Sequence, residues 1–150
     1  MKGVWYFAYG SNMNPERMKE RGVNFKIRKK AFLKCWKLVF NKTSTKNPKE
    51  GFANIVFDGS SIMEGILYLI NEEDIRKLDK YEGYPDHYGR IRVRVLTLDG
   101  AVEAEVYVAQ SDKTAPHLKP PKWYMDHLLK GCDLLSESYC AMLRSIKTLD

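Results

Sequence analysis

The dipeptide Asp99-Gly100 limits the folds open to this chain more than any other part of the sequence, because it separates two runs of alternating apolar residues. Asp-Gly suits a two-residue type I′ turn, whose twist matches that of paired antiparallel strands. Such a turn predicts a hairpin over residues 90–109, with Val93 opposite Val106. In this register one face is apolar and the other is charged, so turn chemistry and side-chain alternation indicate the same pairing.

Other strands and a few helices are predicted along the rest of the chain. Strands rich in β-branched and aromatic residues are expected over residues 2–9, 25–40 (one long or two short), 52–57 and 63–70. A polar, lysine-rich loop, which we expect to be mobile, covers residues 41–51. Gly65 indicates a bulge or a close approach of another part of the chain.

Capping signals predict where the helices begin and end. Asn14-Pro15 is typical of an N-cap followed by proline at the first helical position. Asn71 is expected to cap a second helix, with Asp74 completing a capping box. Two further helices are expected over 123–130 and towards the C-terminus. Because hairpin links outnumber helical crossovers, the fold class is α+β with a mixed, mostly antiparallel sheet.

Length and composition favour one soluble domain over residues 1–150. No apolar run approaches the roughly 20 residues that a membrane helix requires, and the N-terminus does not resemble a signal peptide. We therefore expect a cytoplasmic protein with no membrane partner. Cys35, Cys132 and Cys140 cannot all pair within one chain, so we interpret them as reduced, mostly buried thiols.

The formal net charge of +6 comes largely from lysines and one arginine between residues 26 and 49. A basic stretch can bind nucleic acid. No pattern of stacking aromatics accompanies this one, so we favour a solvated strand edge and loop, with nucleic acid as the less favoured partner. The charge can still attract an anionic small molecule.

The turn after the first strand is a candidate anion site. Glycine frees the backbone there, so the amides of Gly10, Ser11 and Asn12 can converge on a ligand. The helix that begins nearby adds its positive end. The alternative is that this turn only reverses the chain.

Glu82 is the candidate proton acceptor. It stands at the end of the second expected helix, before Gly83 and among Tyr81, Tyr84 and Tyr88. A helix C-terminus disfavours negative charge, and aromatic surroundings disfavour ionisation, so both effects raise its pKa. A raised pKa suits a general base that works near neutral pH. The alternative is an exposed glutamate beside a capping glycine.

Four segments of the sequence resemble the γ-glutamylcyclotransferase family. The signature loop Phe-Ala-Tyr-Gly-Ser-Asn-Met covers residues 7–13, and Leu-Asp-Lys-Tyr-Glu-Gly at 78–83 is similar to the segment with the family's catalytic glutamate. Residues 52–55 resemble a pocket-lining strand, and 121–124 resemble the start of the C-terminal helical segment. These matches follow the family order and span nearly the whole chain.

The resemblance implies a small β-barrel-like core with a few helices around one cavity. It also implies a reaction in which a γ-glutamyl compound cyclises to 5-oxoproline and releases its amine, as in glutathione metabolism. The attacking group is the substrate's own amine, so no metal or cofactor is implied. The roles implied are Glu82 as acid and base, and a binding set of Tyr9, Gly10, Ser11, Asn12, Tyr88 and Tyr124.

Several alternatives stay open at this level. The leaving group is either an amino acid or an amine, and a non-catalytic binding module of the same fold is a further reading. A homodimer is compatible with the sequence. Asn54 and the segment 134–136 depart from the family pattern, which raises the question of whether they reshape the pocket wall and the leaving-group pocket.

Overall fold

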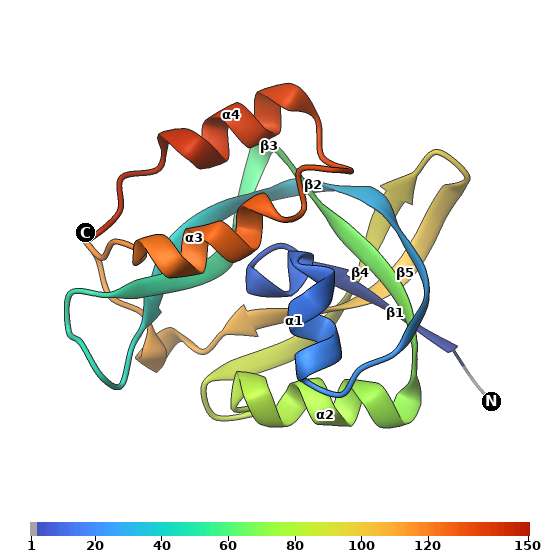
Figure 1. The fold of residues 1–150 in the computed structure, drawn as a ribbon, viewed down its shortest axis with the longest axis horizontal. Coiled ribbons are helices and arrows are strands. Elements are labelled where there is room, and N and C mark those ends of the chain that lie inside the picture. The colour runs from blue at the N-terminus through green and yellow to red at the C-terminus, as the bar shows by residue number, and fades with distance from the viewer. Residues whose placement is uncertain (1–2) are drawn as a thin grey trace.

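Five β-strands close into a barrel in the computed structural model, which describes residues 3–150 (Figure 1). They are β1 (Gly3–Ala8), β2 (Phe25–Thr43), β3 (Gly51–Asn71), β4 (Tyr88–Thr97) and β5 (Gly100–Ala109). Their order around the barrel is β1-β3-β2-β4-β5, and a parallel contact between β1 and β5 joins the two ends of the sheet. All other pairings are antiparallel, so the predicted α+β class with a mixed, mostly antiparallel barrel is confirmed. Lys2 lies outside the described residues.

Strand β3 is continuous, although two shorter strands were predicted for it. Residues 58–61 bulge out of the sheet opposite Cys35, where Asp58 Oδ1 accepts a hydrogen bond from the Ser60 amide at 3.1 Å. Regular pairing resumes on both sides, with Lys34 opposite Ile62 and Trp36 opposite Phe57. The sequence 58–61, predicted as a turn that ends a strand, instead forms a local bulge, because β3 pairs with β2 both before and after it.

The hairpin of β4 and β5 forms, but the predicted register is wrong by two residues. Val93 lies opposite Ala104 rather than Val106. A shift of two keeps every side chain on the same face of the sheet, so the predicted apolar face still points into the core. Alternation alone could not distinguish the two registers.

The hairpin turn explains this shift. Thr97 pairs with Gly100, which makes Leu98 and Asp99 the turn residues. The Thr97 hydroxyl donates to the Gly100 carbonyl at 2.8 Å and accepts from the Asp99 amide at 3.1 Å. Gly100 is the first residue of β5 and has φ 115°, a conformation that glycine adopts more easily than other residues.

The four predicted helices are all present. They are α1 (Pro15–Glu20), α2 (Glu72–Glu82), α3 (Lys122–Leu129) and α4 (Glu137–Ser145), with short 3-10 helices at Ser11–Met13 and Ser111–Lys113. In Figure 1, α1 and α3 lie over one side of the barrel, α2 lies along its lower edge and α4 runs beside α3. Within residues 3–150, no helix is long and apolar enough to cross a bilayer.

One helix cap follows the prediction and one does not. Asn14 caps α1, since its Oδ1 accepts from the Glu16 amide at 3.1 Å. Asn71 precedes α2 but makes no side-chain capping bond. The predicted capping box is wrong because buried Asp74 instead accepts from the Asn24 amide at 3.3 Å, which joins α2 to the start of β2.

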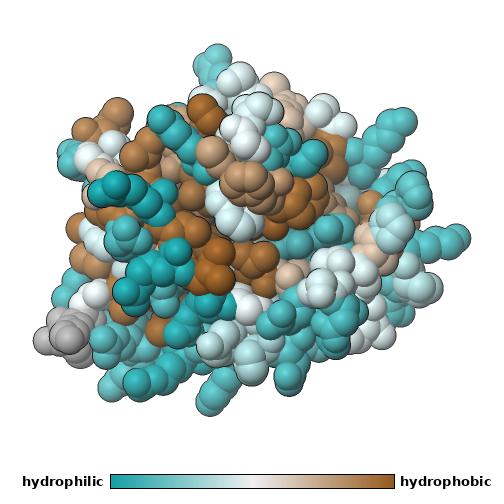
Figure 2. Space-filling view, turned by 180° about the vertical axis from the view of Figure 1, so that it is seen from behind, coloured by the Kyte–Doolittle hydropathy of each residue, from teal (hydrophilic) through white to brown (hydrophobic). Residues whose placement is uncertain are grey.

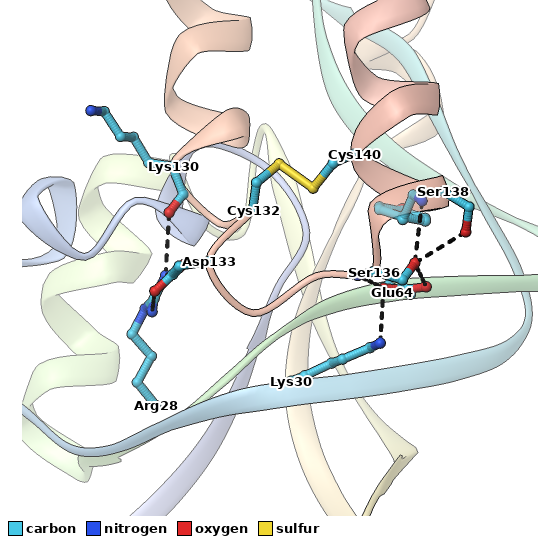
Figure 3. Close-up of a disulfide and its surroundings, with 10 residues drawn as sticks. Arg28, Lys30, Glu64, Lys130, Cys132, Asp133, Ser136, Ser138 and Cys140 are labelled. Atoms are coloured by element: carbon cyan, nitrogen blue, oxygen red, sulfur yellow. Dashed lines mark hydrogen bonds and ion pairs between the residues drawn. A yellow bond between two sulfur atoms is a disulfide. The ribbon is translucent and has the colours of Figure 1, made fainter.

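Cys132 and Cys140 form a disulfide, so their prediction as reduced thiols is wrong (Figure 3). The turn between α3 and α4 brings their Cα atoms to 5.9 Å, within the range that a disulfide spans. Cys35 is free but half-buried. The two cysteines are eight residues apart and belong to no recognised motif, so the sequence does not predict this disulfide. It depends on how the chain turns between α3 and α4.

Polar contacts of Asp133 and Ser136 fasten the segment between α3 and α4 to the barrel (Figure 3). Arg28 of β2 pairs with Asp133 at 2.7 Å. The Ser136 hydroxyl donates to Glu64 of β3 at 2.6 Å, and the Ser136 amide donates to the other oxygen of that carboxylate at 2.9 Å. The α3–α4 segment is therefore held to β2 and β3 from outside the barrel.

One face of the molecule carries a broad apolar area (Figure 2). Figure 2 shows the face opposite to that of Figure 1, where hydrophobic residues gather across the middle and hydrophilic residues border them. Several lysines of the basic stretch are paired with carboxylates, namely Lys29 with Asp99, Lys30 with Glu64 and Lys37 with Asp58. This partial neutralisation favours the solvated strand over a nucleic-acid surface.

Candidate active site

A cavity of about 400 Å³ opens where β1 ends, α2 ends and α3 begins. The loop between β2 and β3 forms another part of its lining. Every site residue predicted from the sequence lines this cavity, namely Tyr9, Gly10, Ser11, Asn12, Glu82, Tyr88 and Tyr124. The fold therefore brings together residues that are widely separated in the chain.

The turn after β1 approaches the cavity with its backbone. A Cβ atom on Gly10 would lie 2.9 Å from the Tyr124 hydroxyl and 3.2 Å from Ala53 Cβ, so glycine lets these parts pack closely. The 3-10 helix Ser11–Met13 starts immediately afterwards. The first amides of a helix have no acceptor within it, so the Ser11 and Asn12 amides are available to a ligand.

The side chains of this turn are held by two arginines that sequence reasoning missed, one in α1 and one directly after it. Arg17 Nε donates to Ser11 Oγ at 3.0 Å, and Arg21 Nη1 donates to Asn12 Oδ1 at 3.0 Å. Both arginines line the cavity. Their spacing of four residues puts them on one helix face, and that was the only signal in the sequence.

Glu82 is the last residue of α2. Gly83 follows it in the left-handed conformation, with φ 64°, and ends the helix. Glu82 Oε1 accepts a hydrogen bond from Asn12 Nδ2 at 3.4 Å and lies 3.7 Å from Arg21 Nη1. Its side chain retains 19% of its exposure. The carboxylate thus lies beside the turn that presents the free amides.

Burial raises the pKa of Glu82, as the sequence indicated. Desolvation by the surrounding protein is the largest cause. The positive charges of Arg21, Arg17 and Lys42 act in the opposite direction but do not cancel it. The sequence argument relied on the helix end and the aromatic neighbours, whereas enclosure in the cavity dominates.

The predicted tyrosines differ in what their hydroxyl groups can offer. Tyr9 donates to the Tyr107 carbonyl and Tyr88 donates to the Ala53 carbonyl, both at 2.7 Å, so these two act as cavity walls. Tyr124 Oη instead accepts from the Ala53 amide at 3.1 Å. Among residues 3–150 no acceptor is recorded for its own proton, which leaves it available to a ligand.

Neither departure from the family pattern lies in the cavity wall. Asn54 points away from the cavity, where its Oδ1 accepts from the Ala109 amide at 2.8 Å and its Nδ2 donates to Asn41 at 2.9 Å. Its neighbour Ala53 lines the cavity instead, as alternation along a strand requires. Residues 134–136 likewise lie outside the cavity lining, because Ser136 of that segment binds Glu64 of β3.

Comparison with known proteins gives one family. The model of the family described as gamma-glutamyl cyclotransferase, AIG2-like, matches residues 6–125. Human gamma-glutamylcyclotransferase is 29% identical over 116 residues, which cover 74% of this chain and 62% of that protein. The bovine gamma-glutamylcyclotransferase is 32% identical over 99 residues, which cover 63% of this chain and 53% of the relative. The aligned parts thus span less than two thirds of either relative.

A solved structure shares the whole architecture. A structure described as gamma-glutamyl cyclotransferase superposes with a TM-score of 0.85 at 25% sequence identity. The match covers 99% of this chain and 90% of that one. The two proteins therefore share one fold over nearly the whole of this chain.

Proposed function

Because this chain belongs to the gamma-glutamyl cyclotransferase, AIG2-like family, we propose that it converts a γ-glutamyl compound into 5-oxoproline and a free amine. The observation that carries this proposal is the position of Glu82 beside Asn12, in one cavity with the free amides of the turn after β1. Such a site holds a proton acceptor and hydrogen-bond donors together. Intramolecular acyl transfer needs both.

Most of the rate enhancement is expected from positioning. The substrate's α-amine attacks its own γ-carbonyl carbon, so the enzyme has to hold the extended side chain in a ring-closing conformation. Effective molarities for well-oriented intramolecular reactions correspond to about 7–11 kcal/mol of the barrier. The walls formed by Tyr9 and Tyr88 restrict the substrate, since both rings are buried and fixed by hydrogen bonds to backbone carbonyls.

Glu82 moves the proton in this proposal. The α-ammonium must lose a proton before its nitrogen can attack, and an ionised carboxylate with a raised pKa takes it. The new C–N bond forms as the carbonyl oxygen gains negative charge. The protonated carboxyl then returns its proton to the leaving nitrogen as the old C–N bond breaks. The attacking nitrogen becomes the N–H of the lactam, so it gives up a second proton to the same carboxylate, and this proton leaves with the amine as its ammonium ion. The products are 5-oxoproline and the amine, with no net change at Glu82.

Donors for the carbonyl oxygen come from the turn after β1. The amides of Ser11 and Asn12 begin a helix and lack partners within it. The Tyr124 hydroxyl lies beside Gly10. Fixed donors of this kind stabilise the oxyanion because they need no reorganisation during the reaction. Loss of one such donor typically costs about 100- to 1,000-fold in kcat.

A direct product assay tests the proposal. The purified protein is incubated with a γ-glutamyl amino acid, a γ-glutamyl alkylamine and glutathione, and both products are quantified against an enzyme-free control. We expect 5-oxoproline and the free amine in equal amounts from at least one compound. Binding without product formation would instead support a non-catalytic module of the same fold.

A further inference from the structure

Lys42 is a buried cation in the wall of the cavity. It lies near the end of β2, opposite Phe52 of β3, and only 5% of it is exposed. Its ammonium group donates to the Thr43 carbonyl at 2.8 Å and lies 5.5 Å from the ring centre of Tyr88. An ammonium group has three donors, so a single hydrogen bond to a neutral carbonyl leaves it poorly satisfied.

Within residues 3–150, Lys42 has no ion pair with a carboxylate, unlike three more exposed lysines of the same strand. Lys29, Lys30 and Lys37 each form an ion pair, at 3.1, 3.4 and 3.7 Å, although all three are more exposed. Burial lowers the pKa of Lys42. The negative charge of Glu82 acts in the opposite direction but forms no ion pair with Lys42 and does not offset the burial. A buried charge without a direct partner costs folding free energy, so this position favours an anionic ligand over an empty cavity.

Of the other cations in the cavity lining, Lys46 and Lys80 are exposed to solvent, and the two arginines already have partners. Arg17 lies in α1 and Arg21 directly follows this helix, and the two hold Ser11, Asn12 and Glu82. That is the part of the site where the γ-glutamyl group is proposed to bind, so these arginines and the amides beside them can serve its α-carboxylate.

Lys42 instead adjoins the loop between β2 and β3. Residues 44–46 of this loop line the cavity together with Thr43 at the end of β2, and Thr45 and Lys46 are exposed to solvent. The loop therefore borders the open part of the cavity. The leaving group is the part of the substrate that extends away from the γ-glutamyl group, and this is the direction in which it can reach solvent.

We propose that Lys42 binds a carboxylate on the leaving group and so selects substrates whose released amine is an amino acid or a peptide. This inference rests on the proposed function and assigns a specificity-determining role to one residue. A γ-glutamyl amino acid adds two carboxylates to the cavity, one for the arginine side and one for Lys42. A γ-glutamyl alkylamine leaves the Lys42 ammonium without an anion.

The test compares two substrates that differ only in this group. γ-Glutamylalanine carries a carboxylate on the leaving group, and γ-glutamylethylamine has a hydrogen in its place. We expect wild-type kcat/KM to favour γ-glutamylalanine by about 10- to 100-fold, the range of one charged, largely buried hydrogen bond. Lys42→Gln should bring this ratio close to one, while Lys42→Arg should retain most of it.

Two further variants separate this role from structural and long-range effects. Lys42→Met keeps an apolar side chain against Tyr88 and should lose the preference for γ-glutamylalanine, as Lys42→Gln does. If one of the two variants fails to fold, the other still tests the proposal. Lys49→Gln removes a charge from the same loop at an exposed position outside the cavity lining. It should leave the ratio unchanged.

The outcomes are distinct for the two proposals. An unchanged ratio in Lys42→Gln, or an equal fall of kcat/KM for both substrates, would overturn the role of Lys42 while leaving the cyclisation in place. A wild-type protein that prefers γ-glutamylethylamine would overturn it as well. Absence of 5-oxoproline from every substrate would instead reject the proposed function, and the Lys42 assignment with it.

Discussion

Glu82→Gln is expected to lower kcat/KM for 5-oxoproline release by about 1,000-fold, within the range typical of a lost general acid–base group. Glutamine has nearly the same shape as glutamate, and its side-chain oxygen can still accept the hydrogen bond from Asn12 Nδ2. It cannot take a proton from the substrate's ammonium at any accessible pH. The measurement is steady-state product release at saturating and limiting substrate.

The folding of this variant provides an internal control. Burial raises the pKa of Glu82 in the folded protein, so its ionised form lowers stability at every pH above that pKa. The cost decreases as the pH falls through the folded-state pKa of Glu82 and disappears below its pKa in the unfolded chain, where the carboxyl is protonated in both states. Glu82→Gln should therefore have a Tm at pH 7 equal to or above that of wild type, and the excess should shrink in acid.

A matched substitution excludes a general effect of charge on α2. Glu73→Gln removes an exposed carboxylate from the first turn of the same helix and should leave kcat/KM unchanged. Turnover by Glu82→Gln within about threefold of wild type would show that another group takes the proton, since a lost general base is expected to cost 100-fold or more.

Gly65→Ala is expected to destabilise the fold by about 3 kcal/mol, at the upper end of what overpacking a core costs. Gly65 is buried in β3, and a Cβ atom there would lie 2.5 Å from Phe7 Cζ and 2.6 Å from the Ala8 carbonyl oxygen. The first contact can relax by moving a ring. The second involves the backbone of β1, directly before the turn of the candidate site, so it cannot relax without moving that turn.

Gly59→Ala is the matched control in the same strand. Gly59 is exposed in the bulge of β3, and nothing lies within 4 Å of a Cβ atom built on it. Its free energy of unfolding should stay within about 0.5 kcal/mol of wild type, as for most surface substitutions. Denaturant unfolding of both variants gives the comparison, and a Gly65→Ala protein as stable as Gly59→Ala would contradict the packing described.

Local chemistry accounts for the elements that could be predicted from the sequence. Asn14-Pro15 defines the start of α1, and the turn residues around Asp99 define the β4–β5 hairpin. Gly65 was expected at a bulge or a close approach, and the close approach is what the structure shows. The helix start and the hairpin could be predicted because the groups that define them lie within a few residues of one another. Gly65 could be predicted because one close contact requires glycine.

Features that depend on distant parts of the chain could not be predicted in the same way. Side-chain alternation could not fix the hairpin register, because a two-residue shift keeps the same apolar face. In the structure, the hydrogen bond from the Thr97 hydroxyl to the Gly100 carbonyl accompanies the observed register. The bond between Cys132 and Cys140 depends on how the α3–α4 turn packs against β2 and β3. Local patterns carry no information on either point.

The candidate site shows the same division. Glu82 and the turn at Gly10 were identified from their local setting together with a family resemblance. Arg17, Arg21 and Lys42 were not, because only the closed barrel brings α1 and the end of β2 to the carboxylate. Their charges oppose the effect of burial on the pKa of Glu82. The fold thus supplies the electrostatics on which the proposed proton transfer depends.

The pH dependence of wild-type kcat/KM tests most directly whether an ionised, partly buried Glu82 accepts the substrate's proton. Activity should fall on the acid side as this carboxylate becomes protonated, with an apparent pKa above the ordinary glutamate value of 4.5. The residual activity of Glu82→Gln should lack this acid limb. A wild-type rate that stays constant down to pH 4.5, or an acid limb that persists unchanged in the variant, would contradict the mechanism.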